Sequence, residues 1–253
     1  MRAVADRSGI EWTETTWNPT TGCDRTSPGC DNCYALALAN RLKAMGQPKY
    51  RNDGDPRTSG PGFALTLHLD TLAIPYTWRS PRLVFVNSMS DLFHLEVPLD
   101  FIRRVFEVMA DTPQHTYQIL TKRSRRLRDV SGELDWPDNV WMGVSVENDR
   151  YAFRIDHLRH VGASVRFVSA EPLLGALPEV DLTGIDWLIA GGESGPRARP
   201  VEEAWLIDLR DRCTAAEVLF FFKQWGGRTP KADGRELLGS TRDEMAQRCF
   251  ALT

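Results

Sequence analysis

The stretch Cys23-Asp-Arg-Thr-Ser-Pro-Gly-Cys30-Asp-Asn-Cys33-Tyr34 places three of the five cysteines of the chain within one short loop. The pair Pro28-Gly29 predicts a turn that brings Cys23 back toward the other two cysteines. The two-residue spacing between Cys30 and Cys33 allows both sulfur atoms to reach one metal ion or cluster. A structural metal site uses four protein ligands, whereas a catalytic site leaves one position open. Three thiols therefore indicate a metal centre with an open position.

The composition of the 253-residue chain is that of an ordinary globular protein, with 42% hydrophobic and 26% charged residues. This excludes the disordered and fibrous classes and leaves room for one barrel-sized domain. The sequence contains no apolar run of membrane-spanning length and no signal-peptide core, so we expect a cytoplasmic protein. In that compartment thiols stay reduced, and clustered cysteines favour metal over disulfide. The net charge of −3 means that any surface for nucleic acid would be local.

Short apolar runs that end in polar residues recur along the chain. They cover residues 63–69, 83–86, 117–120, 140–144, 165–168, 187–190 and 218–222. Runs of this kind are typical of parallel strands buried on both faces. Together with a first strand within residues 10–17, they predict about eight strands. The expected fold is α/β, a TIM-like (β/α) barrel, full or partial, and the alternative is an open doubly wound sheet.

Helical patterns lie between several of these runs, over residues 33–45, 101–110, 149–160 and 201–216. The connection between Ala170 and Asp186 looks short, which admits a partial barrel. We expect residues 1–225 to form the barrel domain, with the cysteine loop after the first strand. Residues 226–253 carry glycines, a proline and charges with little periodicity. They are predicted to be a C-terminal appendage packed on the barrel.

The whole chain resembles a family of phage and bacterial proteins with a three-cysteine motif. The matching stretches are residues 10–13, 17–19, 22–34, 87–93, 120–123, 143–148, 169–173, 191–195 and 222–226. More broadly, the cysteine loop at the start of a predicted β/α barrel resembles that of radical S-adenosylmethionine (SAM) enzymes. The loop here has six residues between its first two cysteines, where the usual radical SAM loop has three.

The radical SAM resemblance implies a cofactor set. In those enzymes three cysteines hold a 4Fe-4S cluster and SAM binds the fourth iron. By this resemblance Cys23, Cys30 and Cys33 are the metal ligands, and SAM is cleaved reductively to a 5′-deoxyadenosyl radical. The electron would come from a reductant protein such as flavodoxin or ferredoxin, and the resemblance to phage proteins favours a nucleic-acid substrate.

Sites in α/β folds lie at the carboxyl ends of the strands, so the polar residues there are the candidates. The predicted cofactor-binding residues are Asn87, Ser88, Asp91, Thr121, Lys122, Arg123, Ser145, Glu147, Asn148 and Glu193. The predicted catalytic residues are Glu147, Glu171 and Lys223. Lys122 and Arg123 would hold a carboxylate or phosphate.

Each assignment has a structural alternative. The serines and Asp91 are also ordinary helix caps, and the glutamates are equally suited to ion pairs with Arg or Lys. Lys122 and Arg123 begin a basic run, with Arg125, Arg126 and Arg128, that suits a solvated helix or a nucleic-acid backbone. Two other functions remain open, namely a zinc protein with a hydrolytic or structural site and a non-enzymatic phage protein that binds nucleic acid or a partner. Cys213 and Cys249 are expected to be structural free thiols.

Overall fold

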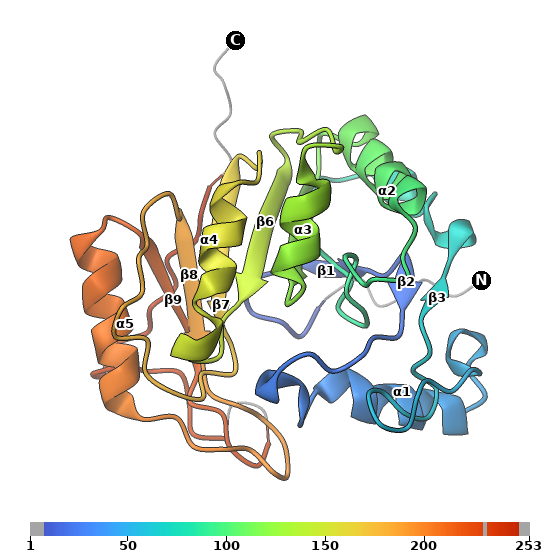
Figure 1. Ribbon diagram of the computed structural model, residues 1–253. Helices are drawn as coiled ribbons and strands as arrows, with labels where there is room; N and C mark the ends of the chain where they lie inside the picture. The colour runs from blue at the N-terminus through green and yellow to red at the C-terminus, as the bar shows by residue number, and fades with distance from the viewer. Residues whose placement is uncertain (1–7, 230–231, 248–253) are drawn as a thin grey trace.

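A computed structural model describes residues 8–229 and 232–247 and shows a parallel β-sheet flanked by helices (Figure 1). The sheet has seven strands in the order β1-β4-β5-β6-β7-β8-β9, and each neighbouring pair is parallel. The strands are β1 (Thr15–Trp17), β4 (Leu83–Val86), β5 (Thr116–Thr121), β6 (Val140–Ser145), β7 (Val165–Ala170), β8 (Trp187–Gly191) and β9 (Leu219–Gln224). Strands β6 and β8 are buried along their full length, as the apolar runs predicted.

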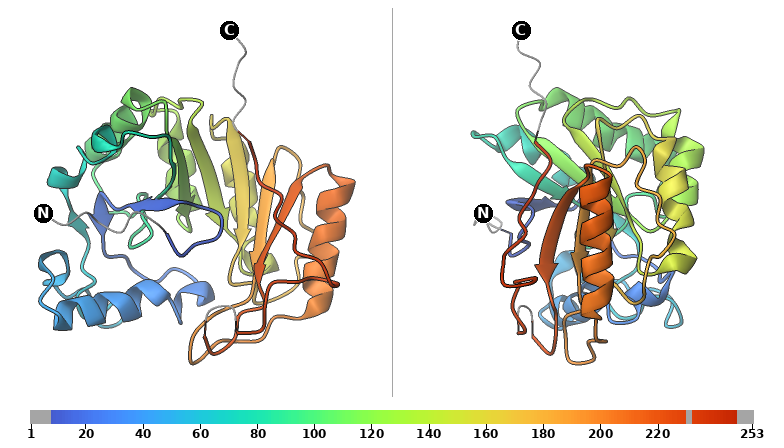
Figure 2. Two further views of the ribbon diagram at one scale, coloured as in Figure 1. Left: turned by 180° about the vertical axis from the view of Figure 1, so that it is seen from behind. Right: turned by 90° about the vertical axis from the view of Figure 1, so that its left-hand side faces the viewer.

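The strand order identifies the architecture as TIM-like. Strands that follow one another in both sequence and space, joined by right-handed crossovers, place every connecting helix on the same face. The helices α2 (Leu99–Asp111), α3 (Ser124–Ser131), α4 (Phe153–Arg159) and α5 (Glu203–Ala215) accordingly lie on one side of the sheet (Figure 2). A doubly wound sheet would reverse its order and carry helices on both faces. The prediction of a TIM-like (β/α) barrel, full or partial, is therefore confirmed in its partial form, and the doubly wound alternative is wrong.

The barrel is partial, and two parts of the chain differ from the predicted alternation of strands and helices. Among the described residues, β1 and β9 do not pair with each other and no helix lies between β7 and β8. The run at residues 63–69 is not a strand of the main sheet. It contributes β3 (Thr66–Leu67), which pairs with β2 (Thr20–Thr21) in a separate antiparallel ribbon. The reason is local, since Phe63 packs against α1 and the His68 Nε2 atom lies 2.8 Å from the Thr21 hydroxyl.

Helix α1 (Tyr34–Ala44) confirms the helix predicted at residues 33–45 but does not cover the sheet. It lies across the carboxyl ends of the strands, beneath the sheet in Figure 1. Cys33 is the residue just before the first turn of α1, and Gly46, just after the end of α1, adopts a positive φ of 71°. The cysteine loop and α1 together cover the end of the sheet at which a β/α protein places its site.

The sheet separates two apolar cores. The larger core lies between the sheet and the helices and includes Cys213 of α5. The smaller core lies on the opposite, inner face and is rich in aromatic rings, with Trp12 centred 4.7 Å from Phe85 and 6.3 Å from Trp187. The segment 242–246 closes this inner core and runs beside β9, where the Phe222 amide donates to the Arg242 carbonyl at 2.9 Å. Within the described ranges no helix is long and apolar enough to cross a membrane.

Candidate functional site

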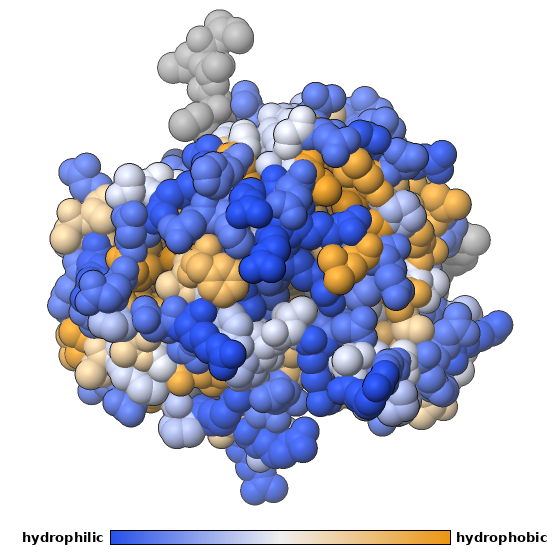
Figure 3. Space-filling view, in the orientation of Figure 1, coloured by the Kyte–Doolittle hydropathy of each residue, from blue (hydrophilic) through white to orange (hydrophobic). Residues whose placement is uncertain are grey.

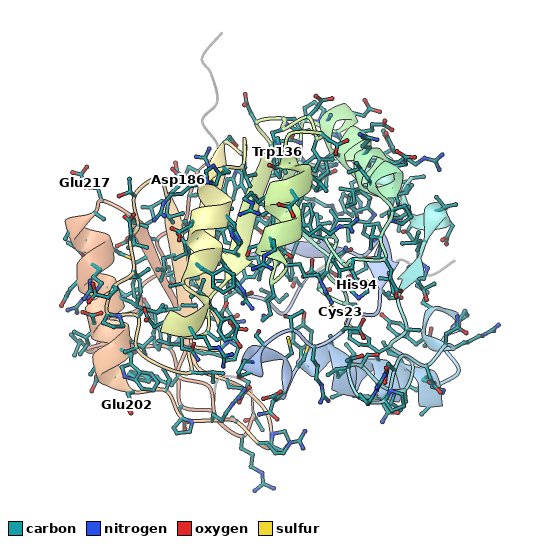
Figure 4. All side chains as sticks on the ribbon, in the orientation of Figure 1. Cys23, His94, Trp136, Asp186, Glu202 and Glu217 are labelled. Carbon is teal, nitrogen blue, oxygen red and sulfur yellow. The ribbon has the colours of Figure 1, made fainter. Side chains whose placement is uncertain are left out.

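A pocket of about 290 Å³ opens at the carboxyl ends of the strands, between the sheet and the cysteine loop. Cys23, Cys30 and Cys33 all line it, and Cys23 is labelled below the strands in Figure 4. Nine of the other predicted residues line the same pocket: Asn87, Ser88, Asp91, Thr121, Lys122, Ser145, Glu171, Glu193 and Lys223. The inner-core rings Trp12 and Phe85 form its apolar wall. Residues from the strand ends and from one loop thus share a single cavity.

The three cysteines suit a metal centre in donor chemistry, although they are not pre-arranged as ligands. All three are free thiols that reach the pocket. Within the described ranges, no group of three His, Cys, Asp or Glu side chains has the geometry to hold a metal ion. Burial raises the pKa of Cys23 to about 12, with the Asp91 charge acting in the same direction and Arg123 opposing it. A positively charged metal or cluster would reverse this preference and favour the thiolate.

Asp91 is a fully bonded structural carboxylate at the wall of the pocket. It accepts hydrogen bonds from the Thr121 hydroxyl at 2.7 and 2.8 Å and from the backbone amides of Phe93 and Lys122 at 3.0 and 3.2 Å. These bonds join the loop after β4 to the end of β5. Asp91 therefore has little acceptor capacity left for a ligand.

Glu171 and Lys223 form an ion pair inside the pocket. The Lys223 Nζ atom lies 3.0 Å from Glu171 Oε1, and the side chains of Lys223 and Glu171 are 23% and 13% exposed. The remaining oxygen of Glu171 has only a long contact of 3.4 Å with the Ser169 hydroxyl. Glu171 is thus the pocket carboxylate with the most room for a further donor.

Glu193 belongs to a network that we call the mouth clamp, consisting of Glu193, Arg199 and Asn32. The Arg199 guanidinium donates to both oxygens of Glu193, at 2.9 and 2.6 Å, and to the Pro28 carbonyl at 2.8 Å. Asn32, which lies between Cys30 and Cys33, donates to Glu193 at 2.9 Å. Burial alone would raise the pKa of Glu193, but the bonds from Arg199 and Asn32 outweigh it and hold that pKa below its usual value. The clamp ties the cysteine loop to the segment after β8.

Glu147 lies behind the loop, away from the pocket lining. It is completely buried and pairs with Arg154 of α4 at 2.8 Å, while the Ser27 hydroxyl donates to its other oxygen. The cysteine loop passes directly over this carboxylate at Gly29. A Cβ atom at position 29 would lie only 2.6 Å from the Glu147 side chain. Glu147 therefore contacts the loop backbone at a point where only glycine fits.

The other predicted residues hold the loops that surround the pocket. Arg123 donates to the Asp24 carbonyl at 3.2 Å, next to Cys23. Asn148 accepts from the Arg150 amide and so caps the short helix η5 (Asp149–Tyr151). This is a structural cap and not the predicted contact with a cofactor. Neither Arg123 nor Asn148 lines the pocket. Lys122 does, and among the described residues its ammonium has no hydrogen-bond or ion-pair partner.

Asn87 and Ser88 stabilise the turn after β4. Asn87 adopts a positive φ of 66°, a conformation that asparagine tolerates, and its amide donates to the Thr20 hydroxyl at 2.9 Å. The Ser88 carbonyl accepts from the Tyr34 hydroxyl at 2.5 Å, which connects the turn to α1.

His94 is buried and its Nε2 atom lies 2.9 Å from Asp24.

Four residues that contact the cysteine loop or its anchors were not predicted from the sequence, namely Ser27, Asn32, Arg154 and Arg199. Their partners lie far away along the chain, as with Ser27 and Glu147, which are 120 positions apart. Arg154 alone carried a usable signal, because it occupies the helix that directly follows the Glu147 strand end. Cys249, predicted to be a structural thiol, lies outside the described residues, whereas Cys213 is buried in the larger core.

The fold and the pocket define an α/β protein with a partial barrel and a three-cysteine site at the carboxyl ends of its strands. Residues 7–246 match the family described as "Protein of unknown function (DUF5131)", and the chain belongs to this family. No curated protein matches the sequence.

Among solved structures the chain is similar to spore photoproduct lyase. One mutant form of that enzyme superposes with a TM-score of 0.48 at 15% identity, over 76% of this chain and 60% of the other. A complex of the lyase with dinucleoside spore photoproduct gives a TM-score of 0.43 at 15% identity, over 69% of this chain and 54% of the other. The chain thus spans at most about three fifths of the length of these two proteins.

Proposed function

We propose that this protein is an iron–sulfur enzyme of the radical SAM type, with Cys23, Cys30 and Cys33 as cluster ligands. The observation that carries the proposal is that three reduced thiols open into one pocket at the carboxyl ends of a parallel partial barrel. Three thiols leave one coordination position for a second ligand, and the pocket gives that ligand a place beside the strand ends. The resemblance of the cysteine loop to radical SAM loops supports the same conclusion.

The residues around the thiols fit such a cofactor pair. When bound, a 4Fe-4S cluster and SAM would supply one-electron cleavage of a carbon–sulfur bond. Glu171 retains acceptor capacity for an ammonium group, and Lys122 has a free ammonium for a carboxylate or phosphate. Trp12 and Phe85 would exclude water from one side of the pocket. The mouth clamp and Glu147 would hold the loop in position over the strand ends.

The proposal is tested by anaerobic reconstitution with iron and sulfide, followed by metal analysis and visible spectroscopy. Cys30→Ala is the test variant, and Cys213→Ala is the matched control because Cys213 is a thiol of the distant larger core. We expect about four irons per chain in the wild type and in the control, with broad visible absorption that Cys30→Ala loses. Addition of SAM to the dithionite-reduced protein should then change the electron paramagnetic resonance spectrum of the cluster.

Two results would contradict the proposal. A colourless protein with one zinc per chain would establish the zinc alternative, with a hydrolytic or structural site. A cluster that forms equally well in Cys30→Ala would remove the cysteine loop from the metal centre. Dithionite supplies the electron in this experiment, so the assay does not depend on the proposed reductant, a protein such as flavodoxin or ferredoxin.

A further inference from the structure

We propose that the α3–α4 rim, defined as Arg125, Arg128, Phe153 and His157, binds a single-stranded nucleic acid beside the pocket. This inference rests on the proposed function in one respect, since it names the substrate class of the same site. The binding itself requires no cofactor, which allows the two proposals to be tested separately.

The rim lies next to the pocket on the α3 side, because α3 begins two residues after the pocket residue Lys122. Helix α3 starts at Ser124, just after the pocket residues Thr121 and Lys122 at the end of β5. Helix α4 starts at Phe153, after β6 and the short helix η5. The start of α3 lies against the last turn of α4, since the Ser124 hydroxyl lies 2.9 Å from the Nδ1 atom of His157. A strand that contacts the rim and the start of α3 would therefore run past the pocket residue Lys122.

The rim offers an aromatic surface to solvent. Phe153 is 43% exposed, and its ring stands edge-to-face on His157 with centroids 5.5 Å apart. The centroid of the Tyr151 ring lies 6.4 Å from that of Phe153, with the two rings tilted against each other. Figure 3 shows a hydrophobic patch over α4 surrounded by hydrophilic side chains. A single exposed ring is unremarkable by itself, but aromatic rings next to cations are what unpaired bases stack on.

Cations surround this aromatic surface. Arg125 and Arg128 belong to α3, whose start contacts His157. Burial lowers the pKa of His157, and the charges of Arg128 and Arg125 lower it further. Arg125 is exposed and has no ion-pair partner among the described residues, while Arg128 pairs only with its exposed neighbour Asp129. Lys122 adds an ammonium at the pocket wall that has no partner in the part of the chain that the structure describes. The acidic groups that act on His157 are Asp156 and Asp129. Asp156 is paired with Arg159, and Asp129 with Arg128.

The combination favours a single strand over a duplex or a peptide. The phosphates of the strand would contact Arg125 and Arg128. A base could stack on Phe153 only where the face of the base is not covered by neighbouring base pairs. The chain as a whole carries a net charge of −3, so attraction to a polyanion must come from this local surface.

The test measures fluorescence anisotropy of the full-length protein with a labelled oligothymidine strand and with the matching duplex, across a salt series. The variants are Phe153→Leu, which keeps an apolar side chain but removes the ring, and the double variant Arg125→Gln/Arg128→Gln. The controls are Arg104→Gln on α2 and Leu238→Ala, both exposed positions outside the rim. Circular dichroism verifies that every variant folds.

We expect the single strand to bind more tightly than the duplex. Phe153→Leu should weaken it about tenfold, within the range for loss of one stacked base. The double arginine variant should lower the slope of log K against log salt by about 0.7 for each phosphate that is no longer neutralised. The controls should bind like the wild type.

The proposal would be overturned by wild-type protein that binds no oligonucleotide at low salt, or by rim variants that bind as well as the controls. Equal affinity for an acidic peptide would also overturn it and would indicate a protein partner. Iron content measured on the same variants separates the two proposals, because rim variants should assemble the metal centre normally. Loss of strand binding with normal iron content supports the rim, whereas a protein without iron that still binds the strand contradicts the proposed function alone.

Discussion

Arg199 contacts three parts of the site at once: the Glu193 carboxylate, the Pro28 carbonyl and the exposed Asp31 at 3.5 Å. Arg199→Gln should destabilise the protein by about 1–2 kcal/mol, because charge-assisted hydrogen bonds are lost from a side chain that is still one-third exposed. Urea unfolding of the metal-free protein measures this. Arg212→Gln, which removes one ion pair with Asp208 within α5, should cost less than about 1 kcal/mol. An equal cost for both would show that the clamp adds no stability.

The Glu193 carboxylate predicts a pH dependence. Its pKa is lower in the folded protein than its usual value of 4.5, so the stability it contributes is fully present above that value and is lost as the pH falls below it. Wild type and Glu193→Gln should therefore differ by a constant free energy of unfolding above about pH 5. The difference should shrink as the pH drops toward the lowered pKa. A constant difference down to acidic pH would contradict this assignment.

At the level of single residues, the sequence predicted the pocket lining better than the contacts that hold it. Asn87, Thr121, Ser145 and Lys223 were found because each follows or ends an apolar run, and strand ends converge in every parallel barrel. Arg199 was not found, because its bonds to the cysteine loop connect positions 171 residues apart. A contact between such distant positions leaves no pattern in the local sequence.

At the level of elements, the cysteine loop depends on its close approach to the end of β6. Gly29→Ala would place a methyl group 2.6 Å from the Glu147 side chain, which Arg154 prevents from moving away. We expect the loop to be displaced, with a cost of about 1–3 kcal/mol and reduced iron uptake after reconstitution. Gly132→Ala is the matched control, since a Cβ atom at that position meets nothing within 4 Å. Normal iron uptake by Gly29→Ala would show that the loop tolerates displacement.

The buried pair that joins the end of β6 to α4 gives a second prediction for these elements. Arg154→Met leaves the Glu147 charge buried without its partner and should cost about 3–5 kcal/mol. The double variant Arg154→Met/Glu147→Gln removes that charge and should recover part of the loss. Thermal unfolding of the two variants tests this. A double variant less stable than Arg154→Met would show that the carboxylate is stabilised by other groups.

The strands were predictable as elements because parallel strands buried on both faces leave continuous apolar runs. Residues 63–69 carried the same pattern for a different reason. Phe63 fills a small cluster with Ala35, Ala39 and Tyr50 beneath α1, so its burial comes from the loop region and not from the sheet. Apolar character alone does not distinguish these two kinds of burial.

At the level of the whole molecule, the inner aromatic core is closed by the segment 242–246. Ala246 is 8% exposed and packs among the inner-core rings, and the Glu244 carbonyl accepts from the Trp187 indole at 2.8 Å. Ala246→Asp places an unpaired charge there and should lower the melting temperature by several degrees and promote aggregation. Ala216→Asp, at the exposed end of α5, should change it little. Similar melting temperatures would show that the segment is dispensable for the core.

The barrel architecture was predictable because apolar runs that alternate with helical patterns indicate parallel strands joined in chain order, and the observed strand order follows the chain. The sequence also indicated the short connection after β7, where the described chain forms no helix. Whether the sheet closes depends on pairing between its first and last strands, which no local pattern encodes. The distinction between a full and a partial barrel therefore required the structure.

The contact between Gly29 and Glu147 also limits how this protein can evolve. A side chain at position 29 fits only if position 147 becomes smaller, so neither site can drift alone. Across the family, the two positions should therefore vary together, with glycine conserved at 29 wherever glutamate is kept at 147. Ancestors that changed one residue would have passed through a poorly tolerated intermediate, which predicts that such exchanges are rare and occur on single branches of the family tree.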